Sequence, residues 1–219
     1  YLKPKYEKNL TSTKSIIPFE LKTKHSIATV DRTPKFYIGG KQARPDGGYS
    51  QAVVSAKGEL LAHIGQGNRK DIRKAVEACT KASAWTNTTA HNRAQVLYYI
   101  AENLALRAEE FATHIQSLTG ESKKSAENEV YASIERLFYY AAYADKLDGA
   151  VHIVPVRGVV LAMPEANGIM GIACPDESPF LGFISLMASA IAMGNRVVMI
   201  PSQTSALMAL EFYQILETS

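Results

Sequence analysis

Two short polar segments contain the side chains best placed to do chemistry. One reads Cys174-Pro175-Asp176-Glu177-Ser178-Pro179 and the other reads Pro201-Ser202-Gln203-Thr204. Each lies at the end of a short apolar run, over residues 168–174 and 196–200, which is typical of a buried parallel strand. In a doubly wound sheet, ligands bind at the carboxyl ends of such strands, where helix N-termini offer free backbone N–H groups. We therefore expect a ligand site at these two segments, although neither contains a GxGxxG loop or a P-loop that would identify a nucleotide.

Single side chains in these segments each allow a chemical and a structural interpretation. Cys174 could be a nucleophile, but no Lys, Arg or His lies near it in the sequence, which favours a packed thiol. Asp176 and Glu177 could form a carboxylate pair for acid–base chemistry, although capping of the following helix is the favoured interpretation. Ser202 is expected to cap the last helix. The five histidines show no metal-ligand spacing and argue against a zinc site: His25, His63, His91, His114 and His152.

The elements in the first half follow from apolar periodicity and turn residues. Residues 36–38, followed by Gly39-Gly40, predict a short strand and turn, and residues 51–55 and 60–64 predict two more strands. Helices are expected from Asn68, as N-cap, to about Ala84; from near Thr89 to Leu118, with a break near Ala108; and from Ser122 to Leu147. An aromatic stripe on the third of these helices is interpreted as core and helix-packing surface: Tyr131, Phe138, Tyr139, Tyr140 and Tyr143.

The second half predicts strands that alternate with helices. Two β-rich runs flank Arg157-Gly158 and predict a β-hairpin over residues 151–163 with a two-residue turn. The strands at 168–174 and 196–200 are followed by apolar helices over residues 179–193 and 205–216. This order predicts an α/β fold, the start of a doubly wound Rossmann-like parallel sheet, with a helical layer and a hairpin beside it.

Composition narrows the function classes. The chain has 219 residues, 47% of them hydrophobic and 21% charged, which excludes collagen-like and wholly disordered chains. Its two cysteines exclude a disulfide scaffold and fit a cytoplasmic protein, and no signal peptide or membrane span is expected. Residues 1–35 carry seven Lys and one Arg against three acids, whereas residues 36–219 carry a net charge of −2. We interpret residues 1–35 as a linker or the tail of a preceding module, without a nucleic-acid partner.

Several segments, in order, carry a family resemblance. They are FYIGGK at residue 36, GNRKDIRKAVEACTKASAWTNTTAHNRAQVLYYIAENLALRAEEF at residue 67, YYAAYADKLDG at residue 139 and GIMGIACPDESPFLGFISLMASAIAMGNRVVMIPSQTSALMALE at residue 168. Over about residues 36–219 the chain resembles the aldehyde dehydrogenase superfamily. The resemblance implies a Rossmann-like fold with an oligomerisation hairpin. It also implies NAD(P)-dependent oxidation of an aldehyde to an acid, through a cysteine thiohemiacetal, hydride transfer and thioester hydrolysis.

The same resemblance implies that the site positions have changed. The family's turn after the first Rossmann strand is Pro-Trp-Asn, whose Asn helps to stabilise the oxyanion; this chain has Glu177 there, which accepts hydrogen bonds and would repel an oxyanion. The family's Lys that reaches the cofactor ribose is replaced by Ile200, and the acidic residue beyond it by Gln203. We therefore expect no catalytic residue in the chain and degenerate cofactor positions at Pro175, Asp176, Glu177, Ile200, Pro201, Ser202 and Gln203.

The family's catalytic Cys, its general-base Glu and its pyrophosphate turn lie further along than Ser219. We therefore expect the chain to be the amino-terminal part of a domain whose remaining half is its partner. The turn CPDE and the segment YLKPK most resemble the second, degenerate module of aldehyde dehydrogenase family 16, in which another aldehyde dehydrogenase module precedes it.

The leading hypothesis for function is a non-catalytic module with a structural role in a homo-oligomer. One alternative is a segment of an active NAD- or NADP-dependent aldehyde dehydrogenase. Another is a nucleic-acid binder with a basic arm, which would show a steep salt dependence.

Overall fold

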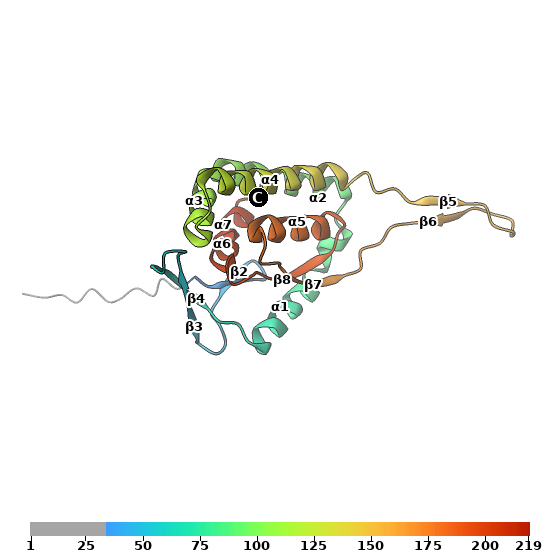
Figure 1. Cartoon of the computed structure of the whole chain (residues 1–219). Coiled ribbons are helices and arrows are strands. Elements are labelled where there is room, and N and C mark those ends of the chain that lie inside the picture. The colour runs from blue at the N-terminus through green and yellow to red at the C-terminus, as the bar shows by residue number, and fades with distance from the viewer. Residues whose placement is uncertain (1–33) are drawn as a thin grey trace, which may run out of the picture. The chain divides into compact units, whose positions relative to one another are not determined.

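The computed structural model of the chain describes residues 34–219 (Figure 1). The predicted linker therefore lies outside the described residues, apart from Pro34 and Lys35. Among the described residues, no helix is both long enough and apolar enough to cross a membrane.

Two antiparallel strand pairs open the described chain. β1 (Phe36–Ile38) pairs with β2 (Lys41–Ala43), and β3 (Ser50–Val54) pairs with β4 (Leu60–Gly65). Gly39 and Gly40 join β1 to β2 with φ of +61° and +72°, a backbone that favours glycine. The predicted strands are thus confirmed, each to within a residue at its ends.

The helices of the first half begin where their capping residues predict. Asn68, Thr89 and Ser122 each accept a backbone N–H of the following helix through the side chain, and Gly120 ends a helix with φ of +75°. The helices are α1 (Arg69–Lys81), the 3₁₀-helix η1 (Ser83–Asn87), α2 (Ala90–Leu106), α3 (Ala108–Thr119) and α4 (Lys123–Tyr143).

The hairpin forms, but with a different loop from the one predicted. β5 (Ala150–His152) pairs with β6 (Val160–Ala162), with Val151 opposite Leu161. The loop therefore runs over residues 153–159, and the expectation of a two-residue turn at Arg157-Gly158 was wrong. Pro155 has no N–H to give to a ladder, and the pair makes no extensive contact with another described element that would extend it. In Figure 1 the hairpin projects away from the helices.

The second half has the predicted β-α-β-α order. β7 (Ile169–Ala173) and β8 (Arg196–Ile200) are parallel, with Ile169 opposite Arg196 and Ala173 opposite Ile200. They are separated by α5 (Pro179–Ala192) and followed by α6 (Ala206–Glu211) and α7 (Tyr213–Glu217).

The single helix predicted over residues 205–216 was wrong, because the helix is interrupted at Phe212. The N–H of Ile215 donates to the C=O of Phe212 over 3.0 Å, three residues back, which tightens the turn. The Phe212 ring is fully buried and lies edge-on to the rings of Phe111, Phe180 and Phe183. The break therefore lies at a residue whose ring is buried in the core.

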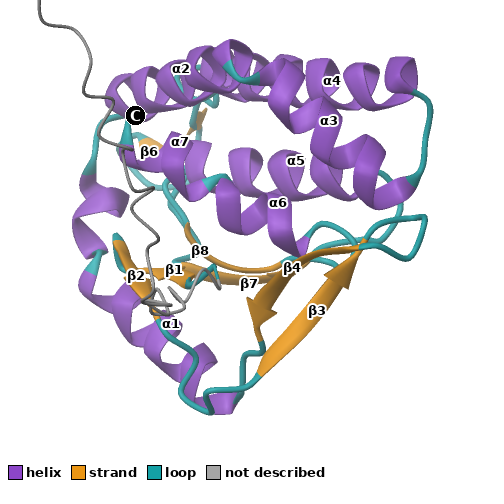
Figure 2. Ribbon diagram, turned by 90° about the vertical axis from the view of Figure 1, so that its left-hand side faces the viewer, coloured by secondary structure: helices purple, strands orange, loops and turns teal. Residues whose placement is uncertain are grey.

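Helices cover both faces of the parallel pair. α5 contacts β8 from one side and α1 contacts β7 and β8 from the other, while α2 and α4 pack on α5 (Figure 2). The buried core lies on the α5 side of the pair, among α2, α3, α4, α5 and α6, with Phe111 and Phe180 stacked at a centroid distance of 5.1 Å. The fold is mixed α/β and covers the amino-terminal part of a doubly wound architecture.

The aromatic stripe on α4 lies mostly at the surface, so its interpretation as core was wrong for most members, whereas helix packing is confirmed for Phe138, whose ring contacts Tyr98 on α2. Tyr131 is 59% exposed and Tyr139 is 56% exposed, and Phe138 and Tyr143 are also exposed. Of the five, Tyr140 packs against the core. The buried face of α4 consists instead of smaller side chains at helical spacing: Ala126, Val130, Ile134, Leu137 and Ala141.

Candidate functional site

The parallel pairing of β7 and β8 brings the two predicted polar segments together. Ala173 and Ile200 are opposite one another at the carboxyl ends of the strands, and the N–H of Cys174 donates to the C=O of Ile200 over 2.9 Å. The turn 174–179 and the segment 200–204 therefore begin side by side at one edge. This is the edge at which the sequence predicts a ligand site.

Both cysteines are packed thiols. Cys174 is half-buried against the core, and burial raises the pKa of its thiol. Burial also raises the pKa of Cys79, with Arg196 acting in the opposite direction, and the Cys79 Sγ lies 3.4 Å from the C=O of Val197 as a donor. A thiol that stays protonated is a poor nucleophile. Within residues 34–219, no group of three or more His, Cys, Asp or Glu side chains could hold a metal ion.

Asp176 and Glu177 lie exposed in the turn between β7 and α5, with Pro175 and Ser178 exposed beside them. The expectation that Asp176 or Glu177 caps α5 was wrong. The carboxylate that accepts the first amides of α5 belongs to Glu129, on α4. The exposed carboxylates are therefore free of a structural role at the helix end.

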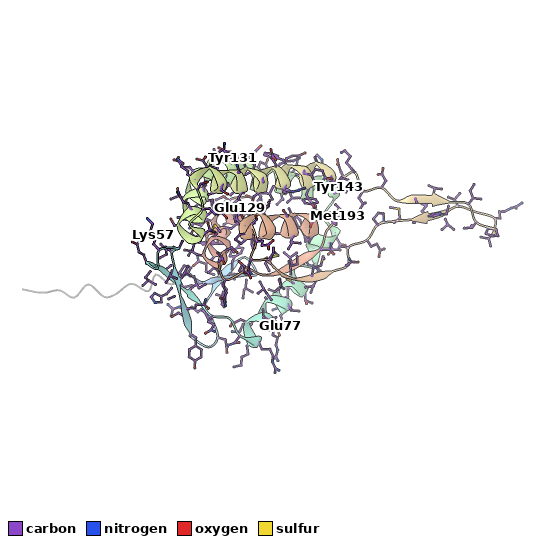
Figure 3. All side chains as sticks on the ribbon, viewed as in Figure 1. Lys57, Glu77, Glu129, Tyr131, Tyr143 and Met193 are labelled. Carbon is purple, nitrogen blue, oxygen red and sulfur yellow. The ribbon has the colours of Figure 1, made fainter. Side chains whose placement is uncertain are left out.

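Glu129 is the residue that sequence reasoning missed. Its Oε1 accepts the N–H of Phe180 over 2.9 Å and the N–H of Leu181 over 3.1 Å, and the residue is only 9% exposed. Burial raises the pKa of this carboxyl, while the two amides act to lower it. Figure 3 shows Glu129 on the side of α4 that faces α5 and Tyr131 on the opposite side. The available signal was an acidic residue directly before Val130, within the apolar stripe of a helix.

No free amide remains at the start of α5. Pro179 has no N–H, Phe180 and Leu181 donate to Glu129, and the N–H of Gly182 donates to the C=O of Ser178 over 2.8 Å. The expectation of free N–H groups at this helix end was therefore wrong. An anionic ligand group would have to compete with a carboxylate that is already in place.

A serine hydroxyl stabilises the turn that follows β8. Ser202 Oγ accepts the N–H of Ser205 over 3.2 Å, and both serines are buried. Ser205 occupies the N-cap position of α6 and no side chain makes a capping hydrogen bond there, so the expectation that Ser202 caps this helix was wrong. Ile200 is 48% exposed and Gln203 is also exposed, so an apolar side chain and a neutral amide face the solvent here.

The other end of α5 is held by donors from α2 and η1. The Arg93 guanidinium donates to the C=O of Ala192 over 2.9 Å and also to the C=O of Thr88. Trp85 Nε1 donates to the C=O of Ile191 over 3.2 Å. A carboxylate at the N-terminus and a guanidinium at the C-terminus both complement the helix dipole. α5 is therefore fixed at each end by a side chain of another helix.

The sequence is similar to one family model and to several named proteins. The sequence model described as the Aldehyde dehydrogenase family matches residues 44–219. Cytosolic 10-formyltetrahydrofolate dehydrogenase of Mus musculus is 27% identical over 197 residues, which cover 85% of this chain and 22% of that protein. Aldehyde dehydrogenase B of Escherichia coli is 29% identical over 182 residues, which cover 82% of this chain and 36% of that protein.

A solved structure agrees with the fold. Betaine aldehyde dehydrogenase of Staphylococcus aureus, in complex with NAD+, superimposes with a TM-score of 0.81 at 22% identity. The match covers 84% of this chain and 38% of that one. The chain thus spans between about a fifth and two fifths of the length of the relatives it matches.

Proposed function

Since the chain belongs to the aldehyde dehydrogenase family, we propose that it is part of a module that serves structure and assembly and does not itself catalyse aldehyde oxidation. Relatives named as dehydrogenases and a related structure with NAD+ support a parent reaction of aldehyde oxidation with a nicotinamide cofactor. The finer proposal concerns this module, whose likeness in sequence is to a degenerate second module that another aldehyde dehydrogenase module precedes.

The observation that carries the proposal is the exposed carboxylate of Glu177 in the turn after β7. Family resemblance assigns this position to an Asn whose side chain donates to the oxyanion. A carboxylate offers acceptors only, and it disfavours negative charge that develops nearby. The turn therefore lacks the donor that the family reaction needs at this point.

The cofactor positions support the same conclusion. Ile200 stands where the family has a Lys, and its side chain cannot donate to a ribose hydroxyl. Gln203 stands where the family has an acidic residue, so a neutral amide replaces its charge. These residues do not fit NAD or NADP, and we propose no step of the module that depends on either.

The hairpin supports a role in assembly. Its strands expose apolar side chains on an element without other extensive packing, including Val151 at 71% and Leu161 at 60% exposure. A two-stranded hairpin is marginally stable alone in water and gains stability when an apolar face is covered. We propose that it pairs with another subunit. The unpaired Cys79 and Cys174 and a relative named as a cytosolic enzyme support the proposal of a cytoplasmic protein.

The test compares the activity of the full-length protein with that of two variants. Aldehyde-dependent reduction of NAD+ is measured for the wild type, for Glu177→Asn and for Glu165→Asn, a matched exposed glutamate in the loop before β7. If the module is non-catalytic, both variants keep the wild-type rate to within about twofold. Oxyanion donors change turnover by about a hundredfold or more, so a change above tenfold for Glu177→Asn alone would contradict the proposal.

A second measurement addresses the cofactor positions. Calorimetric titration of the same protein with NAD+ is expected to give the same affinity for the wild type and for Ile200→Ala, because Ile200 does not contact the cofactor under this proposal. A change of more than tenfold in affinity would instead favour the alternative of an active cofactor site in this module.

A further inference from the structure

α5 begins without a cap from its own sequence. Ser178 occupies the N-cap position with φ of +42°, and its side chain makes no capping hydrogen bond. Pro179 follows with no N–H to satisfy. The first backbone donors that need a partner are therefore the amides of Phe180 and Leu181, which an N-cap side chain would ordinarily take.

Glu129 takes both of these amides from a distant part of the chain. One carboxylate oxygen accepts the two N–H groups, at 2.9 and 3.1 Å, from 51 and 52 residues earlier in the sequence. α4 and α5 pack against each other along their length, which brings Glu129 to the start of α5 and buries it there. The contact is long-range, so it sets where the start of α5 lies relative to α4.

The turn before α5 is coupled to this point by close packing. A Cβ atom built on Gly182 would lie 2.6 Å from Cγ of Pro175, which is closer than atoms pack. The first turn of α5 therefore lies directly against Pro175. The Gly182 amide also donates to the C=O of Ser178, so the turn 174–179 contacts the first turn of α5 at two points.

We propose that Glu129 is a positioning residue for the turn 174–179, because its carboxylate holds the first two amides of α5 and thereby fixes where Asp176 and Glu177 stand at the carboxyl end of β7. The inference rests on the proposed function only where it concerns what the turn 174–179 does in the protein. The charge on Glu129 is not what the arrangement needs. It needs an acceptor oxygen at the end of a side chain of this length.

Three substitutions at Glu129 separate the effect of side-chain length from the effect of charge. Glu129→Gln keeps the length and an acceptor oxygen but removes the charge, whereas Glu129→Asp keeps the charge and shortens the side chain by one methylene. Glu129→Ala removes both. Ser133→Ala is the matched control, because Ser133 is fully buried on the same helix and its hydroxyl bonds within α4, to the C=O of Glu129.

The measurement is amide hydrogen exchange at Phe180 and Leu181, followed by mass spectrometry on the full-length protein. We expect exchange to accelerate at least tenfold in Glu129→Asp and Glu129→Ala, with faster exchange also at Gly182, whose N–H donates to the C=O of Ser178 at the end of the turn. We expect exchange in Glu129→Gln and Ser133→Ala to stay within about threefold of the wild-type rate, because both variants keep an acceptor oxygen at position 129. A merely destabilised core would instead raise exchange in all variants alike.

Unchanged exchange at Phe180 and Leu181 in Glu129→Asp overturns the proposal. So does an equal acceleration in Ser133→Ala, or a Glu129→Gln variant that exchanges as fast as Glu129→Asp. If Glu129→Ala does not fold, the Asp and Gln variants decide the question. The readout requires neither aldehyde nor NAD+, so it can fail while the proposed function holds, and the reverse is equally true.

Discussion

Ser178 has a left-handed backbone at the start of α5, with φ of +42°. Among the described residues that are not glycine, it is the one with a positive φ. Such a backbone costs an ordinary residue about 1 kcal/mol or more, and Ser178 makes no capping bond in return. The strain lies in the turn that carries Asp176 and Glu177, so local geometry there is set by the packing of α5 and not by local preference.

The first prediction at this scale is that Ser178→Gly stabilises the protein. Glycine adopts this backbone without strain, so the free energy of unfolding should rise by about 0.5–1 kcal/mol. Urea denaturation measures it. Ser189→Gly, the same change inside α5, is the control and should lower the free energy of unfolding by about 0.5 kcal/mol. A Ser178→Gly variant that is destabilised as much as the control would show that the serine backbone is not strained.

At the scale of elements, capping residues explain what could be predicted from sequence. Asn68, Thr89 and Ser122 mark three helix starts, and β7 and β8 appear as apolar runs, because these signals are local. The two polar segments of the candidate site were found for the same reason.

Long-range contacts explain what could not be predicted. The cap of α5 comes from Glu129 on α4, and the break before α7 lies at Phe212, whose ring packs against Phe180 on α5. The short strands of the hairpin reflect a lack of neighbours in the described chain. None of these contacts leaves a periodic trace in the sequence, because each joins residues that lie on different elements.

A pH-dependent ion pair joins two of the helices. His114 on α3 lies 2.6 Å from Glu211 on α6, measured from Nδ1 to Oε2. The close contact with the Glu211 carboxylate is the main cause that raises the pKa of His114, and Glu110 acts in the same direction while burial and Arg107 oppose it. A raised histidine pKa means that the stabilisation is complete below the unfolded pKa of about 6.5 and is lost as pH rises through the folded pKa.

We therefore predict that His114→Gln lowers the free energy of unfolding by about 1 kcal/mol at pH 6, and by progressively less at higher pH. Chemical denaturation from about pH 5.5 to about pH 9, an interval that includes the ordinary histidine pKa, measures the difference in unfolding free energy from the wild type. His63→Gln, which removes an exposed imidazole from β4, is the control. A His114→Gln deficit that is constant across this range would rule out a contribution from the ion pair.

At the scale of the whole molecule, the described residues form one well-packed region and one element with few contacts outside itself. α2, α4 and α5 pack continuously with β8, whereas β5 and β6 mainly contact each other. Leu161 and Val151 face one another across the hairpin and remain exposed. This contrast is the physical basis for assigning assembly to the hairpin.

We predict that Leu161→Asp reduces the assembly state of the full-length protein without unfolding it. A charge at an apolar interface is costly to bury, so sedimentation should show a smaller species with an unchanged circular dichroism spectrum. Leu60→Asp is the control, because Leu60 on β4 is 58% exposed and Leu161 is 60% exposed. A wild-type protein that sediments as a monomer, or an equal effect of both variants, would contradict the assembly role.

Because α5 is held at both ends by side chains of other helices, some positions of this sequence can be substituted more freely than others. Glu129 and Arg93 hold the helix from α4 and α2, so the residues that fix the scaffold are not the residues at the carboxyl ends of β7 and β8. Substitutions at 176, 177 and 200 can accumulate there at little cost to folding, since those side chains are exposed and hold nothing in place. The architecture therefore permits the loss of a chemical site while natural selection continues to preserve the fold.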